Sequence, residues 1–341
     1  MRVLVTGASG FLGCHTVGHL LDVGQQVQVL ARDPDRLDAA LGPVGYRSGD
    51  VSVVSGDMTD PASVAAAVAG CDAVVHAAAV YSLDPRQHEV MRATNALGTR
   101  LVLESAAEAG AQRIVYVSSY STLVQPNQTI RPDGPLTSLT TPYILSKVES
   151  EKIARGLRDR GAPVFVVNPP GLIGPDDPYC GDTNRIVMDV LKSRVPMWPR
   201  GSIVWGDTRD TAATIVAMLS AQSPSSAYFG PSTTLPDLAP VDALRRVTGR
   251  SLRTILVPAS VALTAARAID PVASRLPAGW RLPGSDEGGQ LACANPRVDD
   301  STTRDGLGIT GRPIDDALLD TVVWLHQTGR ISARQAGSAL R

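Results

Sequence analysis

Residues 2–13 read RVLVTGASGFLG, and this stretch decides the fold. It begins with a short run of branched apolar residues, which is typical of a strand buried on both faces of a parallel sheet. Glycines follow at positions 7, 10 and 13, and a helical pattern continues to about residue 23. A glycine-rich loop between a strand and a helix is the context that a dinucleotide-binding site requires.

Each glycine of this loop has its own expected task. Gly7 permits a tight turn, Gly10 lets the backbone approach a pyrophosphate, and Gly13 lets the helix lie close to the sheet. The start of the helix then directs unpaired N–H groups at the phosphates. A turn without a ligand is the alternative, but strand, loop, helix and second strand arrive in the required order. The residues expected to line the cofactor here are Thr6, Gly7, Ser9, Gly10, Phe11, Leu12 and Gly13.

Outward from this stretch, strand-like and helix-like segments alternate through the first half of the chain. Such alternation predicts an α/β fold, a Rossmann doubly wound parallel sheet with helices on both faces. The polar, proline-containing segment 123–141 reads as a loop. Strands are expected at 27–30, 51–54, 73–76, 114–117 and 164–167, and helices at 61–69, 86–109 and from Pro142 onward.

The strand–helix rhythm ends after Asn168-Pro169-Pro170-Gly171. The sequence beyond is less regular, which predicts a smaller, interleaved C-terminal region that closes over the carboxyl edge of the sheet. We expect the dinucleotide-binding domain to span 1–170, with 201–235 returning to it. The substrate-binding region is expected to comprise 171–200 and 236–341.

The composition of this 341-residue chain argues against several classes of protein. The 32 basic and 33 acidic residues nearly balance, which removes the electrostatic case for a nucleic-acid partner. The strand-like start lacks the features of a secretory signal, and the four cysteines lack C-x-x-C spacing, so we expect a cytoplasmic protein. The apolar stretch 255–269 contains Pro258 and Arg267 and is too short to span a membrane. His15 and His19 are four residues apart but have no third ligand nearby, so no metal is expected.

The end of the second expected strand indicates which cofactor is used. Ala31 stands where an NAD site usually carries an acidic residue for the ribose hydroxyls. A small neutral residue followed by Arg32 suits a 2′-phosphate, with Arg36 as a candidate second contact. The alternative is a solvated arginine in the charged turn 32–36, where Asp33 offsets part of the attraction. We expect NADP(H), with NAD(H) as the alternative.

A tyrosine and a lysine provide the candidate acid–base pair. Tyr143 and Lys147 are four residues apart, so a helix places them on one face. A neighbouring ammonium lowers the pKa of a phenol, which lets the phenol exchange a proton with a carbonyl oxygen. An exposed helix pair is the alternative. Ser118 and Ser119 follow the strand 114–117 at the sheet edge where α/β sites form, which favours a catalytic role.

Further short motifs accompany these residues. They are Gly56-Asp57-Met58, His76-Ala77-Ala78-Ala79, Asn95, Asn168-Pro169-Pro170-Gly171-x-x-Gly174-Pro175 and Asp207-Thr208-Arg209-Asp210-Thr211-Ala212. Together with the glycine loop and the Tyr–Lys pair, they resemble the extended short-chain dehydrogenase/reductases, the NAD-dependent epimerase/dehydratase family. The resemblance covers essentially the whole chain. Its pattern is nearest to dihydroflavonol reductases, cinnamoyl-CoA reductases and 3β-hydroxysteroid dehydrogenase-like reductases, although it is only weakly specific for substrate.

The resemblance implies a role for each matching residue. Tyr143 is the acid–base, and Lys147 binds the nicotinamide ribose and lowers the pKa of Tyr143. Ser119 contacts the substrate oxygen, with Ser121 as the alternative. Asn95 holds a water or the backbone near Lys147, or else is a polar residue packed between helices. The cofactor contacts expected outside the glycine loop are Arg32, Asp57, Met58, Ala77, Ala78, Ala79, Lys147, Pro169, Pro170 and Gly171.

The expected function is an NADP(H)-dependent oxidoreductase that interconverts a carbonyl and an alcohol on a small, apolar substrate. The apolar residues of 187–198 suggest the pocket, although part of this segment is expected to be helix core. One alternative is an NAD-dependent nucleotide-sugar epimerase or dehydratase, with Arg185, Lys192 and Arg209 binding a diphosphate. A further alternative is a non-catalytic cofactor-binding regulator, against which the retained Ser, Tyr and Lys argue.

The expected partner is a small molecule, and the expected oligomer is a homodimer. Relatives of this family often dimerise through the helices that correspond to 86–109 and 142–160, and alanine-rich faces permit close packing. A monomer is the alternative. The alanine-rich stretch 257–276 is expected to be a buried or lid helix of the second region rather than a lipid contact.

Overall fold

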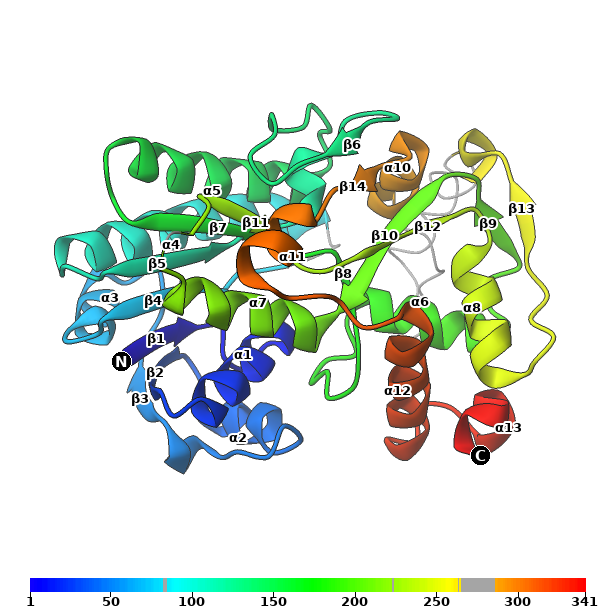
Figure 1. Cartoon of the computed structure of the whole chain (residues 1–341), viewed down its shortest axis with the longest axis horizontal. Coiled ribbons are helices and arrows are strands. Elements are labelled where there is room, and N and C mark those ends of the chain that lie inside the picture. The colour runs from blue at the N-terminus through cyan, green and yellow to red at the C-terminus, as the bar shows by residue number, and fades with distance from the viewer. Residues whose placement is uncertain (82–84, 223, 263, 265–285) are drawn as a thin grey trace.

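The computed structural model describes residues 1–81, 85–222, 224–262, 264 and 286–341. Its centre is a seven-stranded sheet with the order β11-β7-β5-β4-β1-β2-β3, in which every pairing is parallel (Figure 1). The expected doubly wound Rossmann sheet is therefore confirmed. Its strands are β1 (Arg2–Thr6), β2 (Gln26–Ala31), β3 (Ser52–Ser55), β4 (Ala73–His76), β5 (Arg113–Val117), β7 (Val164–Asn168) and β11 (Ala227–Phe229).

Helices cover both faces of this sheet (Figure 1). One layer holds α1 (Phe11–Asp22), α2 (Asp35–Leu41) and α7 (Thr208–Ser220). The other layer holds α3 (Pro61–Val68), α4 (His88–Glu108) and α5 (Pro142–Asp159).

Strand β1 shows why its sequence reads as an unbroken apolar run. Val3 and Val5 belong to the core cluster that includes residues of α1, α2 and α7, whereas Leu4 belongs to the cluster on the α3, α4 and α5 side. Successive side chains of a strand point to opposite faces, so both faces need apolar residues when both are covered. All three side chains are fully buried.

The order of the strands reverses between β1 and β4, because β2 and β3 lie on one side of β1 and β5, β7 and β11 lie beyond β4. The carboxyl ends of these two central strands are in register, with Thr6 opposite His76. Such a reversal leaves a crevice outside the carboxyl ends of the strands, where ligands of open α/β sheets bind. The glycine loop that follows Thr6 lies at this crevice.

The smaller part of the molecule surrounds a three-stranded sheet. Strand β10 (Ser202–Asp207) lies between β8 (Gly171–Ile173), to which it is parallel, and β12 (Thr233–Pro236), to which it is antiparallel. A second core cluster joins residues of this sheet to nearby helices. These helices are α6 (Asp182–Leu191), α8 (Ala239–Thr248), α12 (Ile314–Gln327) and α13 (Ala333–Ala336).

Several shorter elements complete the described structure. Two-stranded pairings link β9 (Met197–Pro199) to β13 (Ile255–Val257), and β6 (Thr129–Ile130) to β14 (Arg297–Val298). The remaining elements are α10 (Asp286–Ala294), α11 (Ser301–Leu307) and the 3-10 turns η1 (Ser48–Asp50), η2 (Pro85–Gln87), η3 (Tyr120–Leu123) and η5 (Gly337–Leu340).

Some sequence-based expectations need correction. The segment 123–141 is not loop alone, because it contains β6. Within 187–198, the expected pocket wall is mostly core: Val187, Leu191 and Trp198 are buried in the second cluster, and Met197 is exposed. The apolar residues of α6 pack inward because the helix needs an apolar face against β8 and α12. This segment therefore gives little evidence about the substrate.

The return segment 201–235 is divided between the two sheets. Helix α7 and strand β11 belong with the large sheet, whereas β10 and the start of β12 belong to the small one. The domain boundaries themselves stay a prediction.

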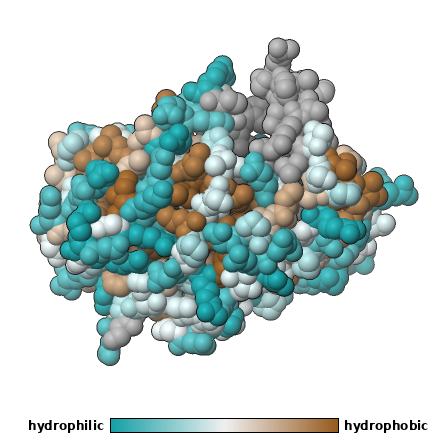
Figure 2. Space-filling model, turned by 90° about the horizontal axis from the view of Figure 1, so that it is seen from above, coloured by the Kyte–Doolittle hydropathy of each residue, from teal (hydrophilic) through white to brown (hydrophobic). Residues whose placement is uncertain are grey.

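Within the described ranges, no helix has the length and apolarity needed to cross a membrane. Most of the stretch 257–276, residue 263 and residues 265–276, lies outside the described residues. The face in Figure 2 has apolar side chains near its centre and also toward both ends, with polar side chains between these patches.

Candidate active site

The glycine loop is folded tightly between β4 and α1. Gly7 has a φ of 80°, and a Cβ there would lie 2.7 Å from the amide nitrogen of Ala78. A Cβ on Gly13 would lie 2.0 Å from the carbonyl oxygen of Gly7. Gly10 is the N-cap of α1 and gives it no side-chain cap, so the first N–H groups of the helix are left for another partner. This arrangement fits a pyrophosphate at the start of α1.

Hydrogen bonds fasten the two central strands at the crevice. The Oγ1 of Thr6 lies 2.8 Å from Nδ1 of His76 and accepts a hydrogen bond from the Ala78 amide. The other ring nitrogen of His76 lies 3.3 Å from the hydroxyl of Thr99 on α4. Burial, aided by the positive charge of Lys147, lowers the pKa of His76 to about 3. His76 is therefore a neutral brace between strands and α4.

An exposed arginine stands at the end of the crevice where adenosine is expected. The side chain of Arg32 is 71% exposed, and its Nη1 lies 3.9 Å from Oδ2 of Asp57. Burial raises the pKa of Asp57, but hydrogen bonds from the hydroxyl and amide of Thr59 outweigh it and lower the pKa below its usual value. Met58 packs on α4, where a Cβ on Gly98 would lie 2.7 Å from its Cγ.

Helix α5 carries the candidate acid–base pair. Lys147 is buried, and its Nζ donates a hydrogen bond of 2.8 Å to the carbonyl oxygen of Val117 and lies 5.2 Å from the ring centre of Tyr116. Burial lowers the pKa of Lys147 to about 8, although the negative charge of Glu151 opposes this change. Tyr143 is half-buried one turn earlier on the helix.

The two serines that follow β5 have different environments. The hydroxyl of Ser118 is buried and donates a hydrogen bond of 2.5 Å to Oε2 of Glu151. Ser119 is half-buried, and its Oγ lies 2.9 Å from Oγ of the buried Ser121. Of these three serines, Ser119 is the one that is not buried, and its role as the substrate contact stays a prediction.

Asn95 braces a loop to α5. Its Oδ1 accepts a hydrogen bond of 2.7 Å from the amide of Val80, and its Nδ2 donates to the carbonyl of Val80 and to the hydroxyl of Ser146. The side chain is buried, and these bonds join the chain after β4 to the residue before Lys147. Asn95 thus holds the backbone of Val80 beside α5, the helix that carries the candidate acid–base pair.

A second aromatic residue lies next to the candidate acid–base. The ring of Tyr81 meets the ring of Tyr143 edge-on, with 4.9 Å between centroids. The Tyr81 hydroxyl donates a hydrogen bond to Asp182 at the start of α6. Tyr81 therefore connects the loop after β4 to the smaller part of the molecule, a link that the sequence analysis did not identify.

The motif after β7 shapes the same region. The carbonyl of Pro169 accepts a hydrogen bond of 2.9 Å from the amide of Tyr120, and Asn168 donates to the carbonyl of Ser119. A Cβ on Gly171 would lie 2.9 Å from the ring of Trp205. The two hydrogen bonds hold the end of β7 against η3, beside the candidate catalytic serine.

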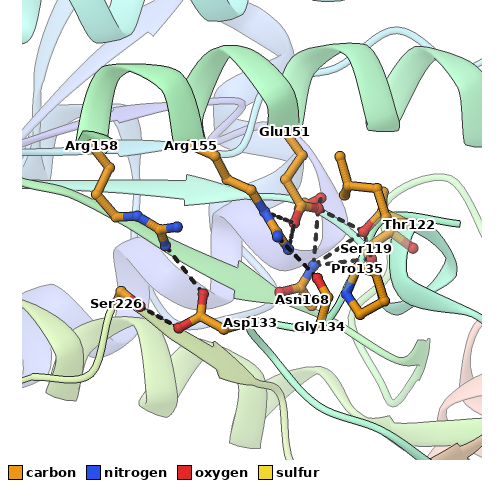
Figure 3. A network of polar contacts seen from close by, with 12 residues as sticks. Ser119, Thr122, Asp133, Gly134, Pro135, Glu151, Arg155, Arg158, Asn168 and Ser226 are labelled. Atoms are coloured by element: carbon orange, nitrogen blue, oxygen red, sulfur yellow. Dashed lines mark hydrogen bonds and ion pairs between the residues drawn. The ribbon is translucent and has the colours of Figure 1, made fainter. Parts of the chain in front are cut away.

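The sequence analysis also missed a buried carboxylate. Glu151 lies one helical turn after Lys147, and Figure 3 shows it pointing toward Thr122 and Asn168. Arg155 donates two hydrogen bonds to Oε1 of Glu151. The i, i+4 spacing from Lys147 was the available signal, because it places Glu151 on the buried face of α5.

One of the three cations proposed for a diphosphate, Arg209, is already paired. Arg209 binds both carboxylate oxygens of Asp207, at 2.9 and 2.6 Å, and also Asp320 of α12 at 2.7 Å. Arg312 similarly binds Asp210, through two nitrogens at 3.0 and 2.8 Å. These ion pairs fasten the smaller part to α7, and Arg209 would have to leave them in order to bind a ligand.

Comparison with known proteins identifies relatives over the whole chain. A model described as the NAD dependent epimerase/dehydratase family matches residues 3–228. A provisionally named dihydroflavonol 4-reductase of Synechocystis sp. is 28% identical over 339 residues, covering 97% of this chain and 96% of that protein. Sterol demethylase protein B of Methylococcus capsulatus is 26% identical over 340 residues, covering 97% and 100%.

A solved structure shares the fold. The crystal structure of gox2253 superposes with a TM-score of 0.79 and 24% identity, and the match covers 97% of this chain and 99% of that one. The similarity includes the smaller part of the molecule as well as the seven-stranded sheet.

Proposed function

The chain belongs to the NAD-dependent epimerase/dehydratase family, and on this basis we propose that it is an NADP(H)-dependent oxidoreductase that interconverts a carbonyl and an alcohol on a small, apolar substrate. One observation carries the proposal. Helix α5 brings Tyr143 and the buried Lys147 to the carboxyl end of β5, next to Ser119 and the crevice at the reversal of strand order.

The acid–base step follows from the environment of the pair. With a pKa of about 8, Lys147 is mostly protonated at neutral pH. An ammonium beside a phenol lowers the pKa of the phenol, so Tyr143 can give its proton to a carbonyl oxygen during reduction and take it back during oxidation. Ser119 would donate a second hydrogen bond to the same oxygen. The nicotinamide, when bound, supplies or accepts the hydride.

The preference for NADP(H) rests on the end of β2. Ala31 offers no carboxylate to the ribose hydroxyls, and Arg32 follows it with most of its side chain in solvent. Its contact with Asp57 is long at 3.9 Å, and exposed ion pairs of this kind are weak. A 2′-phosphate can form a stronger, bidentate interaction with the guanidinium.

The substrate class rests on two observations. The names of the two relatives refer to a flavonoid and a sterol, which are ring systems with few charges. The Tyr81 ring beside Tyr143 offers an aromatic wall to such a molecule. The nucleotide-sugar alternative needs cations for a diphosphate, and one of its three candidates, Arg209, is held by Asp207 and Asp320.

The test is a cofactor titration followed by a substrate screen. Binding of NADPH and NADH is measured by fluorescence, and the protein is then assayed with uncharged ketones and aldehydes and, in parallel, with nucleotide sugars. The proposal expects saturable binding that is tighter for NADPH, and turnover of an uncharged carbonyl. Purification with tightly held NAD and conversion of a nucleotide sugar would overturn it in favour of an epimerase.

A further inference from the structure

A fully buried carboxylate lies behind the candidate catalytic serine. The Oε2 atom of Glu151 accepts hydrogen bonds from Ser118 Oγ at 2.5 Å, Thr122 Oγ1 at 2.6 Å and Asn168 Nδ2 at 3.2 Å. Its Oε1 accepts from Nε and Nη2 of Arg155, at 2.9 and 2.6 Å. A buried charge is costly unless it is paired and hydrogen-bonded, and here both conditions are met.

The donors around Glu151 come from separate elements and also hold the backbone of Ser119. Thr122 is in η3, and its hydroxyl lies 2.7 Å from the carbonyl oxygen of Ser119 as well. Asn168 ends β7, and its Nδ2 lies 3.1 Å from the same carbonyl oxygen. Figure 3 shows Thr122 and Asn168 converging between Glu151 and Ser119. The carboxylate thus orients the groups that fix the position of Ser119.

Glu151 and Lys147 form hydrogen bonds with consecutive residues at the end of β5. Lys147 donates to the carbonyl of Val117, and Glu151 accepts from the hydroxyl of Ser118. The two side chains are one helical turn apart on α5, as is Tyr143 from Lys147. The helix therefore sets the position of the β5 end and of the acid–base pair together.

Glu151 is also the negative charge that acts on Lys147. Among the described residues, the Tyr116 ring on β5 and the neutral His76 on β4 lie near Lys147 from other elements. Tyr143 and Glu151 lie near it on its own helix. Burial favours the neutral amine, and the negative charge of Glu151 raises the pKa of Lys147 against that effect.

We propose that Glu151 is a positioning residue of the reaction: it holds the loop of Ser119 in place relative to Tyr143 and sets a negative charge one helical turn from Lys147. This inference rests on the proposed roles of Ser119, Tyr143 and Lys147. It assigns Glu151 no contact with the substrate or the cofactor.

Three variants separate these effects. Glu151→Gln removes the charge and keeps the side-chain size. Ser118→Ala removes one donor to Glu151 and keeps the charge. Glu149→Gln is the matched control, because it makes the same chemical change two residues away, where the side chain pairs with Arg92 of α4. Each variant is measured for the pH dependence of kcat and, without cofactor, for amide hydrogen exchange of segment 117–124.

The expected results differ among the variants. Glu151→Gln should move the alkaline limb of the kcat profile to lower pH by about one unit, because Lys147 loses a nearby negative charge. A merely structural defect would lower kcat at every pH and leave the limb in place. Exchange in segment 117–124 should become about fivefold faster in both Glu151→Gln and Ser118→Ala, because hydrogen bonds to the loop are lost. Glu149→Gln should match the unchanged protein in both measurements.

The two readouts distinguish this inference from the proposed function. If the unchanged protein reduces no carbonyl, the proposed function fails and the exchange data still decide whether Glu151 holds the loop. Suppose that the unchanged protein is active. If Glu151→Gln then has the same alkaline limb of the kcat profile and the same exchange rate in segment 117–124 as Glu149→Gln, the inference is overturned. Should Glu151→Gln not fold, Ser118→Ala carries the test, and unchanged exchange in that variant overturns the inference.

Discussion

Replacement of Arg32 by alanine should weaken binding of NADPH and leave binding of NADH unchanged. The guanidinium is the charged group that follows β2, where the ribose of the adenosine half is expected. It is 71% exposed, and its contact with Asp57 spans 3.9 Å. A 2′-phosphate therefore meets a cation that is held only weakly by the protein.

The size of the effect follows from this exposure. Hydrogen bonds that involve a charged group contribute about 1.5–3 kcal/mol when they are well shielded from water. An exposed contact is screened, and Asp57 competes for the same guanidinium, so we expect an effect just below this range, about 1.4 kcal/mol or a tenfold rise in Kd. Because the interaction is between exposed charges, the effect should shrink at high ionic strength.

The assay is a fluorescence titration of both cofactors at low salt and at about 0.5 M salt. At the higher concentration, the distance over which charges are screened falls to a few ångström. Arg36→Ala is the comparison, because this neighbouring exposed arginine is already paired with Asp33 at 3.0 Å and should change Kd less than about twofold. Equal weakening of NADPH and NADH, or an unchanged Kd for NADPH, would refute the reasoning about Arg32.

Two further predictions concern the stability of the site. Gly13→Ala should destabilise the fold by about 1–3 kcal/mol and weaken cofactor binding, because its Cβ would lie 2.0 Å from the Gly7 carbonyl oxygen. Gly49→Ala is the control in thermal unfolding, because a Cβ there meets open space, and equal Tm values for the two variants would contradict the prediction. Burial lowers the pKa of His15 to about 4 and of His76 to about 3, so their contribution to stability is present above pH 6.5 and is lost as the pH falls toward these values. Denaturant titrations should show a loss of about 2 kcal/mol per histidine between pH 7 and pH 5, and equal stabilities would be evidence against neutral buried rings.

The strands of the first half of the chain could be predicted because their information is local. Buried parallel strands need apolar residues on both faces, and Val3, Leu4 and Val5 meet that need within three positions. Strand β11 was not predicted, because three residues that follow an irregular segment carry little periodicity. Its place beside β7 depends on α7 returning along the sheet.

Long-range pairings were beyond the sequence. Strand β6 has two residues, and its partner β14 lies far along the chain at 297–298. No local pattern distinguishes such a pair from loop. The apolar residues of α6 were visible, but whether they face a ligand or a core depends on packing against β8 and α12, and the structure buries them.

In the candidate site, too, some features could be predicted from local sequence and others depend on contacts between distant elements. The spacing of Tyr143 and Lys147 is set by one helix, and the position of Ser119 is set by the end of one strand, so each was open to prediction. The bonds of Asn95 to Val80 and the convergence of donors on Glu151 require elements far apart in the chain. Those contacts follow from tertiary structure alone.

The most direct test of the whole account is the rate of hydride transfer in a single turnover by Tyr143→Phe. The enzyme is saturated with NADPH and with a carbonyl substrate identified in the screen, and NADPH oxidation is followed by absorbance. Removing a general acid costs typically about 100-fold or more. We predict a loss of that size in the rate, with the Kd for NADPH unchanged within about twofold because Lys147 is retained. An unchanged rate of hydride transfer in Tyr143→Phe would contradict the account.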